Sequence, residues 1–122
     1  MILDSGIHRF DFDDASRETA HQYINTFKQL YADLPSGTTL RLLLDFRKSG
    51  MPPFKAMAET LRDFTQREDI QQRIAHLYDD QMFTVVMQNL VMHSRLDNDR
   101  YQRQFFRGEQ TEEAIAWLLE ED

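Results

Sequence analysis

The chain alternates between segments whose apolar residues recur at every second position, as in strands, and segments in which they recur every three to four positions, as in helices. Four segments have the character of strands. They cover residues 7–12, 40–46, 73–78 and 99–106. The second, LRLLLDF, is almost wholly apolar, which is typical of a central strand covered on both faces. The fourth, DRYQRQFF, is rich in arginine and glutamine, which favours the edge of a sheet.

Helical spacing of apolar residues follows each of these strands. The predicted helices cover residues 15–33, a segment that begins at Pro52, a segment that begins at 79–80 and the final residues 108–122. Proline is tolerated in a first helical turn, and the carboxylates of DFDDAS and of Asp79 and Asp80 suit helix N-termini. The order βαβαβαβα, with short connections, predicts a single α/β domain over residues 1–122. Its sheet is expected to hold four or five mostly parallel strands, with helices packed on it.

The composition is that of a folded protein and narrows the partners that it can bind. The 122 residues are 41% hydrophobic, enough for one core. A formal net charge of −7 argues against nucleic acid, which requires a positive surface, and the absence of cysteine excludes disulfides and thiolate chemistry. No apolar run has the length of a membrane span, and the first residues lack the pattern of a secretion signal. We therefore expect a cytoplasmic protein without membrane insertion.

Sequence motifs for catalysis or metal binding are missing. There is no GxSxG elbow, no GxxxxGK[ST] phosphate loop and no GxGxxG after a strand. The four histidines lie on four different predicted elements, without the spacing of metal ligands. His76 is expected to be a hydrogen-bonded residue of the core or of a sheet face. We therefore expect no catalytic residues, no metal and no cofactor.

The junction between the second strand and the following helix is a candidate recognition site. Open parallel sheets place their ligands where the carboxyl ends of the strands meet the helix N-termini. The residues at that place are Asp45, Arg47, Lys48, Ser49 and Gly50. A second interpretation stays open, in which Ser49 and Gly50 form an ordinary turn and Asp45 accepts hydrogen bonds from loop amides.

The third predicted helix is apolar around more than half of its circumference. One stripe is expected to cover the sheet and consists of Phe83, Val86, Met87, Leu90 and Val91. Met82, Val85 and Met92 lie off this stripe, and a contiguous exposed apolar patch usually marks an interface or a ligand groove. These three residues are a candidate interface, unless a neighbouring helix covers them or the helix has a different register.

The segments LRLLLDFRKSG, RIAHLYDD and FFRGEQTEEAIAWL together resemble the STAS superfamily, and more narrowly its small stand-alone bacterial SpoIIAA-like branch. The resemblance spans roughly residues 41–120 and implies a compact α/β domain with a role in protein–protein regulation. Some relatives in the wider fold group bind lipids or nucleotides. The best-known members are switched by phosphorylation of a serine at the start of the helix after a buried strand. Ser49 occupies that place here, within RKSG instead of the usual Asp-Ser-Ser or Asp-Ser-Thr run.

Two functions follow from these observations. The first is a non-catalytic regulatory module that binds another protein or itself, as a homodimer, through residues 45–51 and the third helix. The alternative is a carrier or sensor of a small apolar ligand, such as a lipid, held between the third helix and the sheet.

Overall fold

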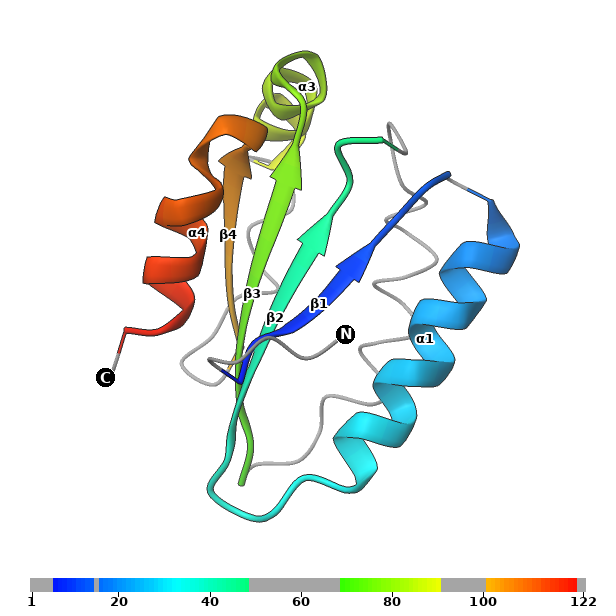
Figure 1. Ribbon diagram of the computed structural model, residues 1–122, viewed down its shortest axis with the longest axis vertical. Coiled ribbons are helices and arrows are strands. Elements are labelled where there is room, and N and C mark those ends of the chain that lie inside the picture. The colour runs from blue at the N-terminus through cyan, green and yellow to red at the C-terminus, as the bar shows by residue number, and fades with distance from the viewer. Residues whose placement is uncertain (1–5, 15, 49–68, 91–100, 121–122) are drawn as a thin grey trace.

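The computed structural model describes residues 6–14, 16–48, 69–90 and 101–120. The elements in these ranges alternate between strand and helix along the chain (Figure 1). They are β1 (His8–Asp11), α1 (Arg17–Ala32), β2 (Thr39–Asp45), β3 (Gln71–Tyr78), α3 (Asp80–Leu90), β4 (Tyr101–Arg107), a 3-10 turn (Gly108–Gln110) and α4 (Thr111–Leu118). The helix expected to begin at Pro52 lies outside the described residues.

The four strands form one parallel sheet in the order β1-β2-β3-β4. Each strand lies beside the strand that precedes it in the chain, and all four point the same way in Figure 1. β2 and β3 are the central strands, and the polar β4 is an edge strand. The sequence predicted the central place of β2 and the edge place of β4. The predicted α/β fold with a mostly parallel sheet is therefore confirmed, with four strands.

The two faces of the sheet carry separate hydrophobic clusters because successive side chains of a strand point to opposite faces. The α1-side cluster contains Phe27 of α1 together with Leu42 and Leu44 of β2. The α4-side cluster contains Leu43 of β2 together with Ala114 and Leu118 of α4. Leu42, Leu43 and Leu44 are all buried, which explains why β2 has almost no polar break. In Figure 1, α1 and α4 accordingly lie on opposite sides of the sheet.

Side-chain caps fix where α1 and α3 begin. Ser16 Oγ accepts a hydrogen bond from Thr19 N at 3.2 Å, and Asp14 Oδ1 accepts from Ser16 N at 2.9 Å. At α3, Asp79 Oδ1 accepts from Met82 N at 2.8 Å. The carboxylates that the sequence assigned to helix starts therefore satisfy backbone donors that have no partner within the helix.

The last helix begins later than the sequence predicted. Residues Gly108–Gln110 form a 3-10 turn, and α4 begins at Thr111 instead of Gly108. The turn is held by Gln110, whose side-chain oxygen accepts a hydrogen bond from Arg107 N at 2.9 Å. This side-chain contact competes with a regular first turn, and the periodicity of apolar residues does not reveal it.

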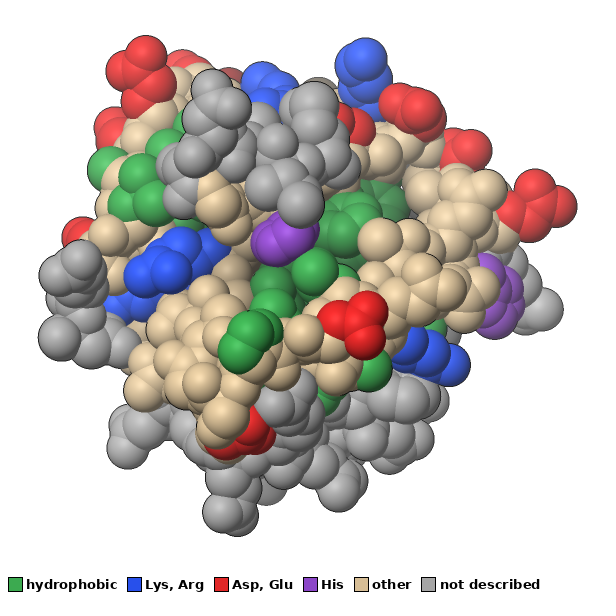
Figure 2. Space-filling view, turned by 60° about the horizontal axis from the view of Figure 1, so that its bottom comes forward, with side chains coloured by type: hydrophobic (Ala, Val, Ile, Leu, Met, Phe, Trp, Pro, Cys, Tyr) green, Lys and Arg blue, Asp and Glu red, His purple; other side chains and the backbone are tan. Residues whose placement is uncertain are grey.

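Among the described residues, no helix combines the length and the apolar character needed to cross a membrane. Acidic side chains are spread around the outer part of the face shown in Figure 2, while hydrophobic side chains and a histidine line a hollow near its centre. The described part of the chain contains no group of three or more carboxylates or histidines that could hold a metal ion.

Candidate functional site

The carboxyl ends of the four strands lie level with one another at one edge of the sheet, called the carboxyl edge below. In the register of the sheet, Asp11 is the partner of Asp45, and Tyr78 is the partner of Arg107. Figure 1 shows α3 beyond the ends of β3 and β4, at the same edge. The candidate recognition residues of the β2 end therefore lie where parallel sheets usually bind their ligands.

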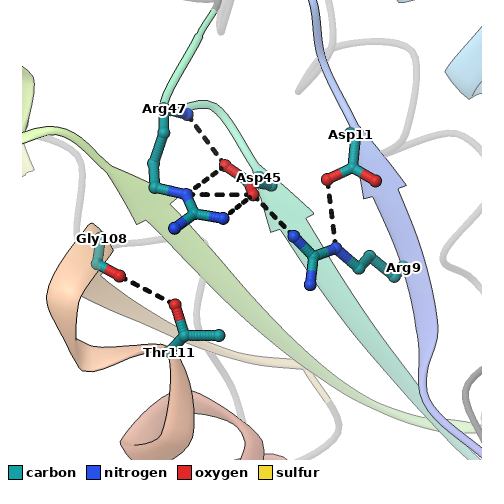
Figure 3. Close-up of polar contacts among 6 residues, drawn as sticks. All are labelled: Arg9, Asp11, Asp45, Arg47, Gly108 and Thr111. Carbon is teal, nitrogen blue, oxygen red and sulfur yellow. Dashed lines mark hydrogen bonds and ion pairs between the residues drawn. The ribbon is translucent and has the colours of Figure 1, made fainter.

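Asp45 is the centre of this edge. Its side chain is 8% exposed and lies between two arginines, Arg9 of β1 and Arg47 just beyond β2 (Figure 3). Arg47 donates from Nη2 to Asp45 Oδ2 at 2.6 Å, from Nε to both carboxylate oxygens and from its backbone N to Oδ1 at 3.0 Å. Arg9 Nη2 donates to Oδ2 at 2.9 Å. Both oxygens of the buried carboxylate are thus occupied by charged donors.

These contacts keep Asp45 ionised. Burial alone would raise its pKa, but the hydrogen bonds from Arg47, together with the charges of Arg47 and Arg9, lower the pKa below its ordinary value. The hydrogen bonds with Asp45 raise the pKa of Arg47 in turn. A carboxylate that holds its charge this firmly and has both oxygens engaged is poorly suited to act as a general base. Its function in the structure is to fix the two guanidinium groups.

The second interpretation of this junction is supported in part, because a loop amide, that of Arg47, does donate to Asp45. Arg47 and Lys48 are exposed at the surface, so the basic groups of the candidate site are accessible. Ser49 and Gly50 lie outside the described residues, and the structure does not place them.

Three further residues of the carboxyl edge come from other parts of the chain. Arg9 joins Asp45 to Asp11, whose Oδ1 accepts from Arg9 Nε at 3.1 Å. On the other side, the aliphatic part of Arg47 lies against Gly108, and Thr111 Oγ1 donates to Gly108 O at 2.8 Å (Figure 3). Sequence reasoning did not identify Arg9, Asp11 or Gly108 as parts of the site. The only signal in the sequence for Arg9 and Asp11 was the alternation of residues 7–12, which places both on one face.

The candidate interface on α3 is described in part. Val85 is 37% exposed, whereas Met82 is partly buried and packs against the α1-side cluster. Phe83 also packs against that cluster, and the guanidinium of Arg107 lies over its ring at 5.0 Å from the centroid. Met92 lies outside the described residues. The interface thus remains a prediction, centred on Val85.

His76 is buried, as the sequence indicated, on the α1 side of the sheet. Its ring is parallel to within 19° of the rings of Phe46, Tyr78 and Phe105. Phe46 directly follows β2, Tyr78 ends β3 and Phe105 lies on β4. Nδ1 lies 3.4 Å from the hydroxyl oxygen of Tyr78. Burial, with a smaller contribution from the charge of Arg103, lowers the pKa of His76 to about 3, so that the imidazole is neutral at pH 7.

Comparisons with known proteins assign no family and no role to these residues. No protein-family model, no curated protein and no solved structure matches the chain.

Proposed function

We propose that the chain is a non-catalytic regulatory module of the STAS type, which acts by binding another protein or a second copy of itself. The carboxyl edge, with Arg9, Asp45, Arg47 and Lys48, is its recognition surface. The observation that carries this proposal is the buried carboxylate of Asp45, which holds two guanidinium groups in fixed positions at the edge where parallel sheets bind their ligands.

The arrangement favours recognition over chemistry. Asp45 is ionised and fully hydrogen-bonded, so it is not a proton acceptor of the kind that catalysis needs. By contrast, the side chain of Arg47 is 39% exposed, and its planar head is preorganised by Asp45. A preorganised guanidinium loses less conformational freedom on binding a partner than a mobile one does.

The charge of the surroundings indicates the kind of partner group. The chain has a net charge of −7, yet at the carboxyl edge the fold brings Arg9 to the same carboxylate as Arg47, and Lys48 follows Arg47 in the sequence. A local basic site on an acidic protein attracts an acidic or phosphorylated segment of a partner. The rest of the surface, which is acidic on balance, attracts such a segment less.

The proposal is tested with a pair of variants that change the net charge equally. Lys48→Gln removes one positive charge at the carboxyl edge, and Gln29→Glu adds one negative charge at an exposed position of α1. Proteins that co-purify with each variant from the native cell are quantified by mass spectrometry. We expect specific partners to be depleted for Lys48→Gln and retained for Gln29→Glu. Equal recovery of every partner by both variants would contradict the assignment of the surface.

Self-association is the other arm of the proposal and is measured directly. Size-exclusion chromatography with light scattering distinguishes a dimer from a monomer of 14.6 kDa. If the dimer forms through α3, Val85→Lys should convert it to a monomer without changing the circular dichroism spectrum, because Val85 is exposed. A wild-type chain that stays monomeric at every concentration would remove self-association and leave only a different partner.

A further inference from the structure

The α1 side of the sheet contains a buried polar atom that the fold leaves without a partner. His76 is 8% exposed, and its Nε2 has no hydrogen-bond partner. A buried nitrogen of this kind costs free energy unless another group or a ligand satisfies it. Because Nδ1 lies near the hydroxyl of Tyr78, the second nitrogen is the one that needs a partner.

The neighbouring groups define what that partner must be. The hydroxyl oxygen of Tyr78 lies 3.4 Å from Nδ1 of His76, and we take the imidazole tautomer in which this hydroxyl donates to Nδ1. The single proton of the neutral imidazole is then on Nε2, which requires an acceptor oxygen. Arg103 of β4 is close enough to lower the pKa of both His76 and Tyr78, so its positive charge favours an acceptor that is negatively charged.

The surrounding rings define the rest of the ligand. The imidazole lies between Phe46 and Phe105 in the order of the strands, with ring centroids 5.8 and 4.6 Å away. Phe105 is only partly buried, and the guanidinium of Arg103 lies over its ring at 5.8 Å from the centroid. The polar atom is therefore set among flat apolar surfaces beside the edge strand β4, and small-molecule sites are usually lined by such surfaces with a few polar groups.

We propose that His76 and Arg103 bind the carboxylate of a small carboxylic acid whose apolar body contacts Phe105 and the neighbouring rings. The carboxylate accepts a hydrogen bond from His76 Nε2 and pairs with the guanidinium of Arg103. This site is on the opposite side of the sheet from Asp45 and does not depend on the proposed partner-binding function.

Titration calorimetry and histidine nitrogen NMR test the site, with benzoate and octanoate as probes and benzyl alcohol and octanol as neutral counterparts. We expect a carboxylate to bind and to shift the Nε2 resonance of His76. We expect the alcohols to bind at least about tenfold more weakly, as for the loss of one charge-assisted hydrogen bond.

Variants separate this site from nonspecific uptake of apolar molecules. Arg103→Gln should weaken carboxylate binding by about tenfold or more and leave the affinity for the alcohols unchanged. Arg107→Gln, on the same strand, and Lys48→Gln, at the carboxyl edge, should bind like the wild type. His76→Phe should abolish binding of the carboxylates. If the His76→Phe protein does not fold, the comparison of Arg103→Gln with the wild type decides the question. The inference is overturned if millimolar benzoate and octanoate leave the His76 resonance unchanged, or if the alcohols bind as tightly as the acids.

Discussion

The side chain of Arg47 and the backbone of Gly108 are packed so closely that a side chain at position 108 would displace Arg47. A Cβ atom on Gly108 would lie 2.6 Å from Cδ and 3.2 Å from Cγ of Arg47. The same arginine holds Asp45 through its guanidinium. Through this contact, the turn that precedes α4 limits where the basic group at the end of β2 can lie.

Replacing Gly108 with alanine should therefore disturb the carboxyl edge. Arg47 must move away from the new methyl group, and its hydrogen bonds with Asp45 lengthen or break. We expect a loss of about 1–3 kcal/mol in the free energy of unfolding, the usual range for overpacking. Urea unfolding of the wild type and of Gly108→Ala measures this difference.

A double-mutant cycle shows whether the cost arises from Arg47. In the background of Arg47→Ala the clash is absent, so Gly108→Ala should be neutral or should stabilise by a few tenths of a kcal/mol, because alanine restricts the unfolded chain. An equal cost in both backgrounds would show that the backbone at position 108, and not Arg47, excludes a side chain.

Asp45 should be the most sensitive residue of the carboxyl edge. Asp45→Asn leaves Arg9 and Arg47 side by side without the carboxylate that holds both. Breaking a fully buried pair costs about 3–5 kcal/mol. Since Arg47 and Arg9 can turn partly to water, we expect about 2 kcal/mol here, measured by urea unfolding at pH 7. Asp11→Asn is the matched control, because Asp11 is 54% exposed and should lose less than about 0.5 kcal/mol.

The sequence predicted the fold well because period and composition report directly on burial. The apolar run around Leu42–Leu44 indicated a central strand, and the polar composition of residues 99–106 indicated an edge strand. The structure confirms both. The caps at Asp14 and Asp79 were also predictable, because they are local in the sequence.

The candidate site was predictable only at the end of β2. Arg9 and Asp45 are 36 residues apart and meet because β1 pairs with β2 in the register that sets Asp11 opposite Asp45. Alternation of apolar and polar residues shows which face a side chain points to, but it does not show register. Gly108 approaches Arg47 only because the turn after β4 reaches across to the end of β2, a relationship that requires the complete sheet.

Arg73 should hold the end of α4 against the sheet. It is 7% exposed, donates from Nη1 to Trp117 O at 2.8 Å and lies over the indole ring at 5.5 Å from its centroid. Arg73→Met keeps much of the apolar contact but leaves a helix-terminal carbonyl without this donor, which should cost about 1–3 kcal/mol. Because Trp117 is the only tryptophan in the chain, its fluorescence should report the loosening of α4 directly.

The ion pair of Arg73 with Glu120 provides the control. Its atoms are 3.6 Å apart and Glu120 is 63% exposed, so Glu120→Gln should change the free energy of unfolding by less than about 0.5 kcal/mol. If Arg73→Met and Glu120→Gln lower the free energy of unfolding equally, the ion pair and not the hydrogen bond to Trp117 O accounts for the effect of Arg73.

The buried imidazole of His76 should make the protein less stable in mild acid. Its pKa is about 3 in the folded chain and about 6.5 in the unfolded chain. Between these values the unfolded chain binds a proton that the folded chain does not, so stability falls as the pH falls, by up to about 1.4 kcal/mol for each pH unit. Burial also lowers the pKa of His8, which acts in the same direction.

Urea unfolding between pH 7.5 and about 4.5 isolates this effect. Carboxylates whose pKa is lowered in the folded chain, such as Asp45, change the free energy of unfolding mainly below their unfolded pKa of about 4. The comparison is made in the background of His8→Gln, with and without His76→Phe. Phenylalanine keeps a ring in the stack with Phe46 and Phe105 but binds no proton, so the dependence on pH should become much flatter. A slope that survives His76→Phe would place the proton uptake at another group and would mean that the pKa of His76 is not lowered in the folded chain.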